Sequence, residues 1–364
     1  MTLPREDVRR AAGRAVMCGF EGTSVGPELK EILREVRPAG VVLFARNVES
    51  PLQVSELGAE IKSLRADDPI LLAVDQEGGR VARIREPATE WPAMRTLGAI
   101  DDADLARRVG AALGAELRAM NFDVDFAPVL DVDTNPHNSV IGDRSFARES
   151  DRVATLGCAF MEGLHNAGVA ACGKHFPGHG DTDVDSHKAL PRITHDLSRL
   201  REIEWPPFRR AIEAGLGAVM TAHVVVEALD EERPATLSRA ALSPLRHELG
   251  FRGVIISDDL EMRAVADGYT VDQMVRYGLQ AGVDVFLACH DPEVILGVYR
   301  AVVQSAERRD LDHDDLRALE KRVLTWSRRF YAPAVDVKRV ADVVGCSEHA
   351  VIAEDVRSRA SALV

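Results

Sequence analysis

A cluster of histidines and aspartates lies near the middle of the chain. His175, His179 and His187 fall within thirteen residues, and Asp185 stands two positions before His187. Residues two apart in extended backbone project on the same side, so the Asp185 carboxylate could accept a hydrogen bond from the His187 ring. An imidazole braced in this way can serve as acid and as base near neutral pH. The spacing therefore predicts an Asp–His dyad on a glycine-rich loop.

Two other interpretations of this cluster stay open. A histidine often does no more than satisfy a buried carbonyl group. His175 and His179 also have the i, i+4 spacing of zinc ligands, which would fit a metal-dependent hydrolase. That spacing needs a helix, however, and Pro177 and Gly178 between the two histidines break one. We therefore favour acid–base chemistry and expect no metal.

A carboxylate candidate follows a continuous apolar run. Residues 254–257 read Val-Ile-Ile-Ser, which is typical of a buried parallel strand, and Asp258 and Asp259 follow directly. One of the two can cap the next segment, while the other would face an open site. We prefer Asp258 as the reactive residue because it stands immediately at the strand end. The spacing alone leaves Asp259 open.

Charged residues follow other apolar runs as well. Residues 75–83 and 135–146 hold carboxylates, arginines and glycines, with which a ligand rich in hydroxyl groups could be bound by charge-assisted hydrogen bonds. For Arg80 and Asp143, a salt bridge that closes the top of the fold is an equally good explanation. His223 follows the sixth run, and either completes a polar rim or satisfies a hydrogen bond in the core.

The elements that must position these residues alternate regularly. Short apolar runs are each followed by a longer segment of helical period, which is typical of βα units. Eight such units fit an α/β fold of the (β/α)8 TIM-barrel type, with a doubly wound open sheet as the competitor. The positions of the motifs after the strands favour the barrel. The expected strands are residues 13–19, 40–44, 70–74, 124–130, 169–172, 218–222, 254–257 and 283–287.

Length and composition fit this architecture. The 364 residues carry a formal net charge of −13 and are 46% hydrophobic. A chain of this length and hydrophobic content can bury a core without disulfides or structural metals. We expect a catalytic domain over residues 1–331 and a linker with a tail helix over 332–364. The acidic charge argues against nucleic acid and anionic membranes as partners. Five scattered cysteines predict reduced thiols, and the charged start of the chain predicts a cytoplasmic protein. We expect a monomer without a cofactor.

Four segments together resemble glycoside hydrolase family 3, and within it the bacterial β-N-acetylglucosaminidases of peptidoglycan recycling. They are residues 75–80, 140–146, 174–187 and 257–260, and the similarity extends over about residues 10–330. The resemblance implies that Asp258 is the nucleophile, His187 the general acid/base and Asp185 its partner. It also implies that the terminal N-acetylglucosamine is bound by Asp75, Arg83, Arg144, Lys174 and His175.

The function that follows is a retaining exo-β-N-acetylglucosaminidase with a covalent glycosyl-enzyme intermediate. Its substrate would be a small carbohydrate, either a muropeptide or another β-linked glycoside such as a chitin fragment. A phosphorylase that uses the same residues is the alternative within the family, because an imidazole does not repel incoming phosphate. A metal-dependent barrel hydrolase and a sugar-binding barrel without turnover are the alternatives from other classes.

Overall fold

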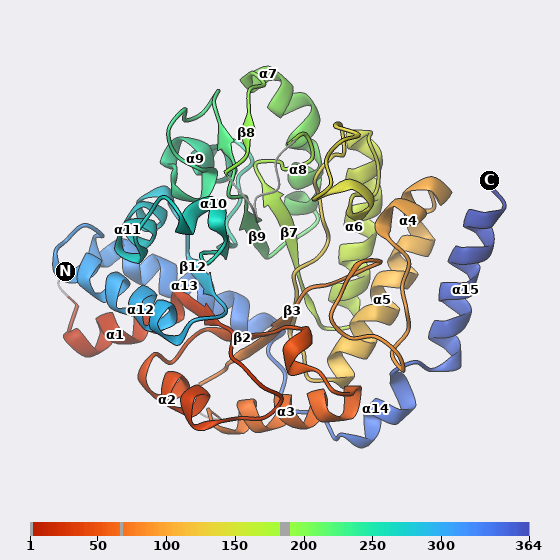
Figure 1. Ribbon diagram of the computed structural model, residues 1–364, viewed down its shortest axis with the longest axis horizontal. Coiled ribbons are helices and arrows are strands. Elements are labelled where there is room, and N and C mark those ends of the chain that lie inside the picture. The colour runs from red at the N-terminus through yellow and green to blue at the C-terminus, as the bar shows by residue number, and fades with distance from the viewer. Residues whose placement is uncertain (1–2, 66–67, 183–189, 364) are drawn as a thin grey trace.

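The protein folds into a closed barrel of parallel strands surrounded by helices (Figure 1). The computed structural model describes residues 3–65, 68–182 and 190–363. Around the barrel the strands follow chain order, and the last strand pairs with the first through Phe286 and Val16. This closure confirms the predicted (β/α)8 barrel over the open sheet. The barrel strands are β1 (Val16–Cys18), β2 (Gly40–Leu43), β3 (Leu71–Val74), β6 (Val124–Asp125), β7 (Ala170–Phe176), β9 (Ala218–Thr221), β11 (Val254–Asp259) and β12 (Val285–Ala288).

The helices begin where the sequence supplies capping groups. The side chains of Ser50, Asp102 and Asp291 accept backbone N–H groups at the starts of α3, α5 and α12. The helices are α1 (Arg5–Arg14), α2 (Pro27–Glu35), α3 (Pro51–Ser63), α4 (Met94–Ile100), α5 (Ala103–Ala119), α6 (Ser150–Asn166), α7 (Leu197–Arg199), α8 (Pro206–Glu213), α9 (Arg239–His247), α10 (Arg263–Ala266), α11 (Val271–Ala281), α12 (Pro292–Glu307), α13 (His313–Phe330), α14 (Lys338–Val343) and α15 (Ser347–Ser361).

Two short sheets that the sequence did not predict lie outside the barrel wall. β4 (Gln76–Gly78) and β5 (Val81–Ala82) form an antiparallel hairpin directly after β3, and β8 (Arg192–Ile193) pairs with β10 (Val225–Val226). Strand β6 is much shorter than the expected run 124–130, and Pro128 in that run has no N–H group to donate to a ladder. The hairpin matters most, because it carries Glu77 and is flanked by the candidate site residues Asp75 and Arg83.

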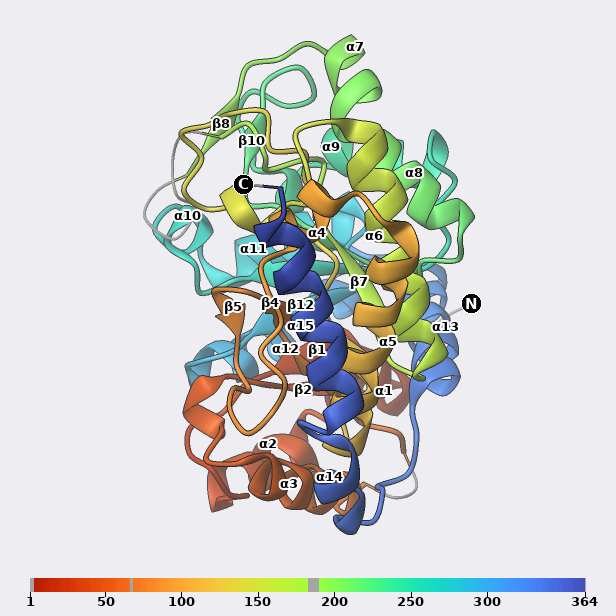
Figure 2. The same ribbon diagram turned by 90° about the vertical axis from the view of Figure 1, so that its right-hand side faces the viewer.

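The C-terminal segment lies along the outside of the barrel. The predicted tail helix is present as α15, and the shorter α14 precedes it. Helix α15 packs against α4 and α5, as Figure 2 shows from the side. The five cysteines are free thiols, as expected. Within the described ranges, no helix is long and apolar enough to cross a bilayer.

The N-terminal ends of the strands are closed by buried ion pairs. Asp123, immediately before β6, accepts hydrogen bonds from Lys62 at 2.9 Å and from Arg118 at 2.6 Å. Asp284, immediately before β12, is bound in the same way by two arginines, Arg246 and Arg322. Both carboxylates are almost completely buried. Each also accepts a backbone N–H group of the neighbouring strand. These two carboxylates therefore link adjacent strands to helices at this end of the barrel.

Candidate active site

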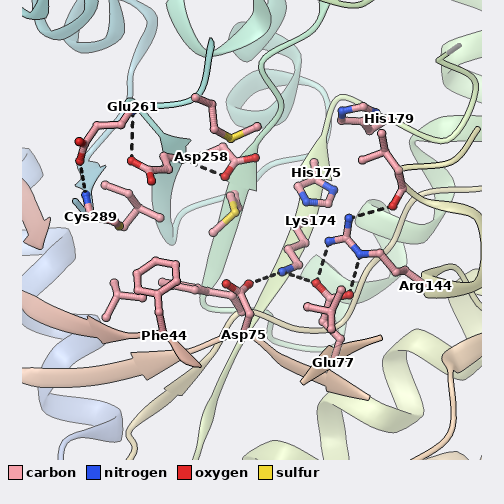
Figure 3. A pocket seen from close by; sticks show the side chains of 18 of the residues that line it. Phe44, Asp75, Glu77, Arg144, Lys174, His175, His179, Asp258, Glu261 and Cys289 are labelled. Carbon is pink, nitrogen blue, oxygen red and sulfur yellow. Dashed lines mark hydrogen bonds and ion pairs between the residues drawn. The ribbon is translucent and has the colours of Figure 1, made fainter. Parts of the chain in front are cut away.

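The opposite end of the barrel holds a cavity of about 470 Å³ (Figure 3). Its walls come from the residues that follow the C-terminal ends of the strands, which is where barrel enzymes carry their catalytic groups. Charged side chains make up much of its lining, and apolar and aromatic side chains lie between them. Those that matter here are Phe44, Asp75, Lys174, His175, Asp258 and His290.

Asp258 is the candidate nucleophile, and it lines this cavity from the end of β11. Its side chain is partly exposed, and its Oδ1 accepts the backbone N–H of Asp259 at 2.8 Å. Burial alone would raise the pKa of the Asp258 carboxyl, but the nearby rings of His223 and His175 outweigh burial and hold that pKa below its ordinary value. Asp258 is therefore ionised at neutral pH, as a carboxylate nucleophile must be.

Asp259 also reaches the cavity, but its carboxylate is engaged at both oxygens. Oδ1 accepts the backbone N–H of Glu261 at 3.2 Å, and Oδ2 lies 3.3 Å from His290 Nε2. The bond to Asp259 raises the pKa of His290 above its ordinary value. Asp259 thus caps a turn and binds His290. The sequence predicted such a capping role for one of the two aspartates without deciding which. This difference favours Asp258 as the reactive carboxylate.

A cluster of alternating charges forms the side of the cavity nearest β3 and β7. Lys174 Nζ lies 2.6 Å from Asp75 Oδ1 and 2.6 Å from Glu77 Oε1. Glu77 is in turn bound by both ends of the Arg144 guanidinium, at 2.7 and 2.8 Å. Arg83 Nη2 lies 3.5 Å from Asp75 Oδ2. The cluster therefore fixes Asp75 on two sides while leaving it on the cavity wall.

Charge pairing keeps these buried groups ionised. Burial would lower the pKa of Lys174, but Asp75 and Glu77 raise it above its ordinary value. Burial would raise the pKa of Glu77, yet Arg144 and Lys174 hold it well below the ordinary range. Each charge therefore depends on its partners, and the geometry of the cluster is tightly coupled.

His175 is oriented by a buried aspartate. Asp131 Oδ2 lies 2.7 Å from His175 Nδ1, and Oδ1 accepts the backbone N–H of His179 at 2.7 Å. Burial would raise the pKa of Asp131, but the His175 ring outweighs burial and lowers it. The second ring, His179, is buried beside Thr182, and desolvation lowers its pKa to about 4. His179 is thus neutral at pH 7.

The two histidines of the metal alternative belong to no metal-binding group within the described residues. The His175 and His179 rings meet edge to face, with centroids 5.7 Å apart. Across residues 3–65, 68–182 and 190–363, no group of three or more His, Cys, Asp and Glu side chains is placed to hold a metal ion.

The structure brings together most of the residues that the sequence singled out. One cavity is lined by Asp75, Arg83, Arg144, Lys174, His175 and Asp258. Asp185 and His187 lie outside the described residues, so the predicted dyad stays a prediction. Arg80 and Asp143 form an exposed ion pair at 2.8 Å, which is the salt bridge that the sequence allowed for them.

His223 departs from the expected rim position. It is fully buried, its Nδ1 is hydrogen-bonded to Thr236 Oγ1 at 2.8 Å, and its Nε2 to the backbone oxygen of Asp259 at 3.0 Å. Both ring nitrogens are therefore satisfied within the protein. His223 thus lies behind the cavity wall and does not line the cavity. This placement does not favour the predicted contact between His223 and the sugar.

Two carboxylates that hold residues of the candidate site escaped the sequence analysis. Asp131 stands directly after the expected strand 124–130, so the strand-end rule that selected Asp75 and Asp258 would have found it. Glu261 accepts the backbone N–H groups of the loop after β12, from Cys289 at 2.7 Å and from Asp291 at 2.9 Å. No local sequence signal indicates that contact, because its partners are about 30 residues away.

The open end of this (β/α)8 barrel holds an ionised aspartate together with lysine, arginine and histidine side chains. This arrangement is typical of barrel enzymes that act on polar substrates. The comparisons identify which one. The model of the glycosyl hydrolase family 3 N-terminal domain matches residues 16–326, so the chain belongs to glycosyl hydrolase family 3 and is a glycoside hydrolase. The predicted family is confirmed.

Known relatives span most of the chain. A β-hexosaminidase of Nitrosomonas eutropha is 44% identical over 284 residues, which is 76% of this chain and 81% of that protein. A family 3 β-N-acetylglucosaminidase from Paenibacillus sp. has a similar structure, with a TM-score of 0.94 and 37% identity over 97% of this chain and 68% of that one. NagZ from Neisseria gonorrhoeae in complex with N-trifluoroacetyl-D-glucosamine has a TM-score of 0.80 and 35% identity over 95% and 98% of the two chains.

Proposed function

We propose that the protein is a retaining exo-β-N-acetylglucosaminidase that removes terminal N-acetylglucosamine from β-linked glycosides. The observation that carries the proposal is the placement of Asp258, an ionised carboxylate in the cavity facing the Lys174 and His175 side. The names of the relatives and the N-acyl glucosamine bound to NagZ from Neisseria gonorrhoeae support the same sugar class. Muropeptides are the proposed natural substrates, as in peptidoglycan recycling.

The first half-reaction forms a glycosyl-enzyme ester. An oxygen of Asp258 bonds to the anomeric carbon while the bond to the leaving oxygen breaks, and His187 gives that oxygen its proton. In the second half, His187 takes a proton from water as the water attacks the same carbon and the ester bond to Asp258 breaks. Two displacements return the β configuration. Asp185 is proposed to orient His187 and to favour its protonated form.

The charged cluster holds the terminal sugar in this scheme. Asp75 can accept hydrogen bonds from sugar hydroxyl groups, and Arg83 and Arg144 can donate to hydroxyl or carbonyl oxygens. Because Lys174 holds Asp75 and Glu77 holds Arg144 before substrate arrives, little ordering of these two groups is needed on binding.

Trapping the intermediate tests the proposal. A fluorinated mechanism-based N-acetylglucosamine glycoside should label Asp258 of the wild-type enzyme, as read by mass spectrometry of peptides. The Asp259→Asn variant serves as the matched control and should label at the same position. A label on Asp259, or no label together with no turnover of an aryl β-N-acetylglucosaminide, would contradict the assignment.

The products separate the hydrolase from the phosphorylase. Proton NMR of the first product formed in the presence of inorganic phosphate should show free β-N-acetylglucosamine. A sugar 1-phosphate as the main product would assign the phosphorylase reaction to the same residues instead.

A further inference from the structure

The hairpin of β4 and β5 brings Glu77 to the cavity, and Arg83, which also lines it, directly follows β5, so the position of the hairpin matters for the site. Its turn is docked on the backbone that follows. Gly79 N donates to the backbone oxygen of Trp91 at 2.9 Å, and a Cβ on Gly79 would lie only 2.8 Å from the Cα of Ala93. Gly79 also has a φ of +58°. The hairpin is therefore fastened to the segment 84–93.

That segment is itself held by one buried carboxylate on α5. Glu116 accepts hydrogen bonds from Thr89 at two points, from the backbone N at 3.1 Å and from Oγ1 at 2.6 Å. Thr89 and Glu116 are 8% and 4% exposed, so these bonds are shielded from water. Glu116 thus fixes the segment that supports the hairpin.

The C-terminal segment completes the coordination of Glu116. Oε1 accepts the backbone N–H of Gly345 at 3.0 Å and the ring of His349 at 2.8 Å. The His349 ring also packs beside Trp91, with centroids 6.5 Å apart. Gly345 approaches Pro87 so closely that a Cβ there would lie 2.0 Å from the Pro87 oxygen. The tail therefore contacts the supporting segment directly and also through Glu116.

We propose that the segment carrying Gly345 and His349 is a positioning element of the active site, which acts through Glu116 and Trp91 on the hairpin. The inference rests on the proposed function, because it assigns ground-state binding of the sugar to residues of that hairpin. Loss of the His349 contacts removes one bond that positions Glu116 and the ring that packs beside Trp91, so the segment 84–93 can shift and the hairpin shifts with it. Arg83 and the Glu77–Arg144 pair then no longer match the sugar, while Asp258 on β11 stays in place.

Three full-length variants test this. His349→Ala removes the bond to Glu116 and the contact with Trp91. His349→Asn places an amide donor near the position of the ring Nδ1 and should restore the bond. Arg359→Ala is the matched control, because it removes a tail contact on the same helix, to Asp102 at 2.8 Å, which does not involve Glu116.

We expect His349→Ala to raise KM for an aryl β-N-acetylglucosaminide about three- to tenfold with little change in kcat, the signature of lost ground-state binding. His349→Asn should recover most of the wild-type KM. Arg359→Ala should lower the melting temperature to a similar extent as His349→Ala and leave KM unchanged. Equal KM values for His349→Ala and wild type, or equal rises for His349→Ala and Arg359→Ala, would overturn the proposal.

Amide hydrogen exchange keeps the two proposals distinguishable, since it needs no substrate. Faster exchange over residues 76–84 in His349→Ala than in Arg359→Ala supports the positioning role even if the wild-type protein hydrolyses no glucosaminide. If the wild-type protein turns over the glucosaminide while His349→Ala shows unchanged exchange and unchanged KM, the positioning role is contradicted and the proposed function is not.

Discussion

The two ends of the barrel use the same residue type in opposite ways. At the N-terminal end, Asp123 and Asp284 are buried, and each is bound by two cationic side chains and a strand N–H group. At the C-terminal end, Asp258 stands in an open cavity and accepts the N–H of its neighbour. A carboxylate whose hydrogen-bonding capacity is filled by the protein contributes to stability, whereas one that faces open space is available for chemistry.

The contrast extends to neighbouring residues in the chain. Asp258 and Asp259 are adjacent, yet the second is held by His290 and by the backbone of Glu261. The distinction between structure and chemistry is therefore drawn by the partners that surround a residue and not by its type or its distance along the strand.

The largest effect is expected from Asp258→Asn. Loss of the proposed nucleophile should lower kcat about 10⁴-fold or more, because an amide cannot form the glycosyl ester. The melting temperature should change little, because the Asp258 side chain supports few contacts. Steady-state kinetics and calorimetry on the same preparations would check both. A kcat of the variant within tenfold of the wild-type value would contradict a catalytic role for Asp258.

Asp284→Ala tests the opposite end. It leaves Arg246 and Arg322 without their shared carboxylate, and we expect a loss of about 3–5 kcal/mol in the free energy of unfolding. The kcat per folded molecule should stay near wild type, because the cavity lies at the other end of the strands. Urea unfolding followed by active-site titration measures the two quantities separately. A fall in kcat at unchanged stability would contradict the division.

Acid sensitivity should arise at both ends of the barrel through two histidines, the buried His179 and the partly buried His165. Desolvation lowers the pKa of His179, near the cavity, and of His165, on α6, to about 4 each. The unfolded chain takes up protons near pH ~6.5 while the folded chain does not, so stability falls as pH drops from about 6.5 to about 4. For the fully buried His179 the loss is at most about 3 kcal/mol.

The variants His179→Asn and His165→Asn should each flatten this pH dependence, as measured by denaturant unfolding between pH 7 and pH 4. Only His179→Asn should also change KM, because its ring contacts His175 in the cavity wall. An unaltered slope in both variants would assign the acid sensitivity to other groups.

A smaller effect is expected from Arg83→Ala. Its guanidinium lies 3.5 Å from Asp75 on the cavity wall, so we expect KM to rise about tenfold through loss of one charge-assisted hydrogen bond to the sugar. Arg85→Ala, an exposed position two residues further on, is the control and should leave KM unchanged. Equal KM values for the two variants would contradict a specific contact between Arg83 and the sugar.

Local pattern was sufficient for the barrel and for part of the site. Each apolar run became a strand, since a parallel strand is buried on both faces and must be apolar throughout. Asp75 and Asp258 follow from the same reasoning, because the ends of parallel strands meet at one edge of the barrel. Lys174 lies within β7 and was indicated only by the family resemblance. The hairpin of β4 and β5 does not follow from local pattern, because its strands are too short for any alternation to be recognised.

The sequence by itself determined the fold class, the family and the candidate residues, because periodicity, strand-end position and motif are properties of neighbouring residues. Only the tertiary structure decided that His223 lies behind the site, that Asp259 is occupied, and that the tail reaches Glu116. Those outcomes depend on hydrogen bonds to partners far along the chain, as in the 2.8 Å contact of His349 with Glu116 across 233 positions. Which polar groups are satisfied and which stay available is fixed only when the chain has closed on itself.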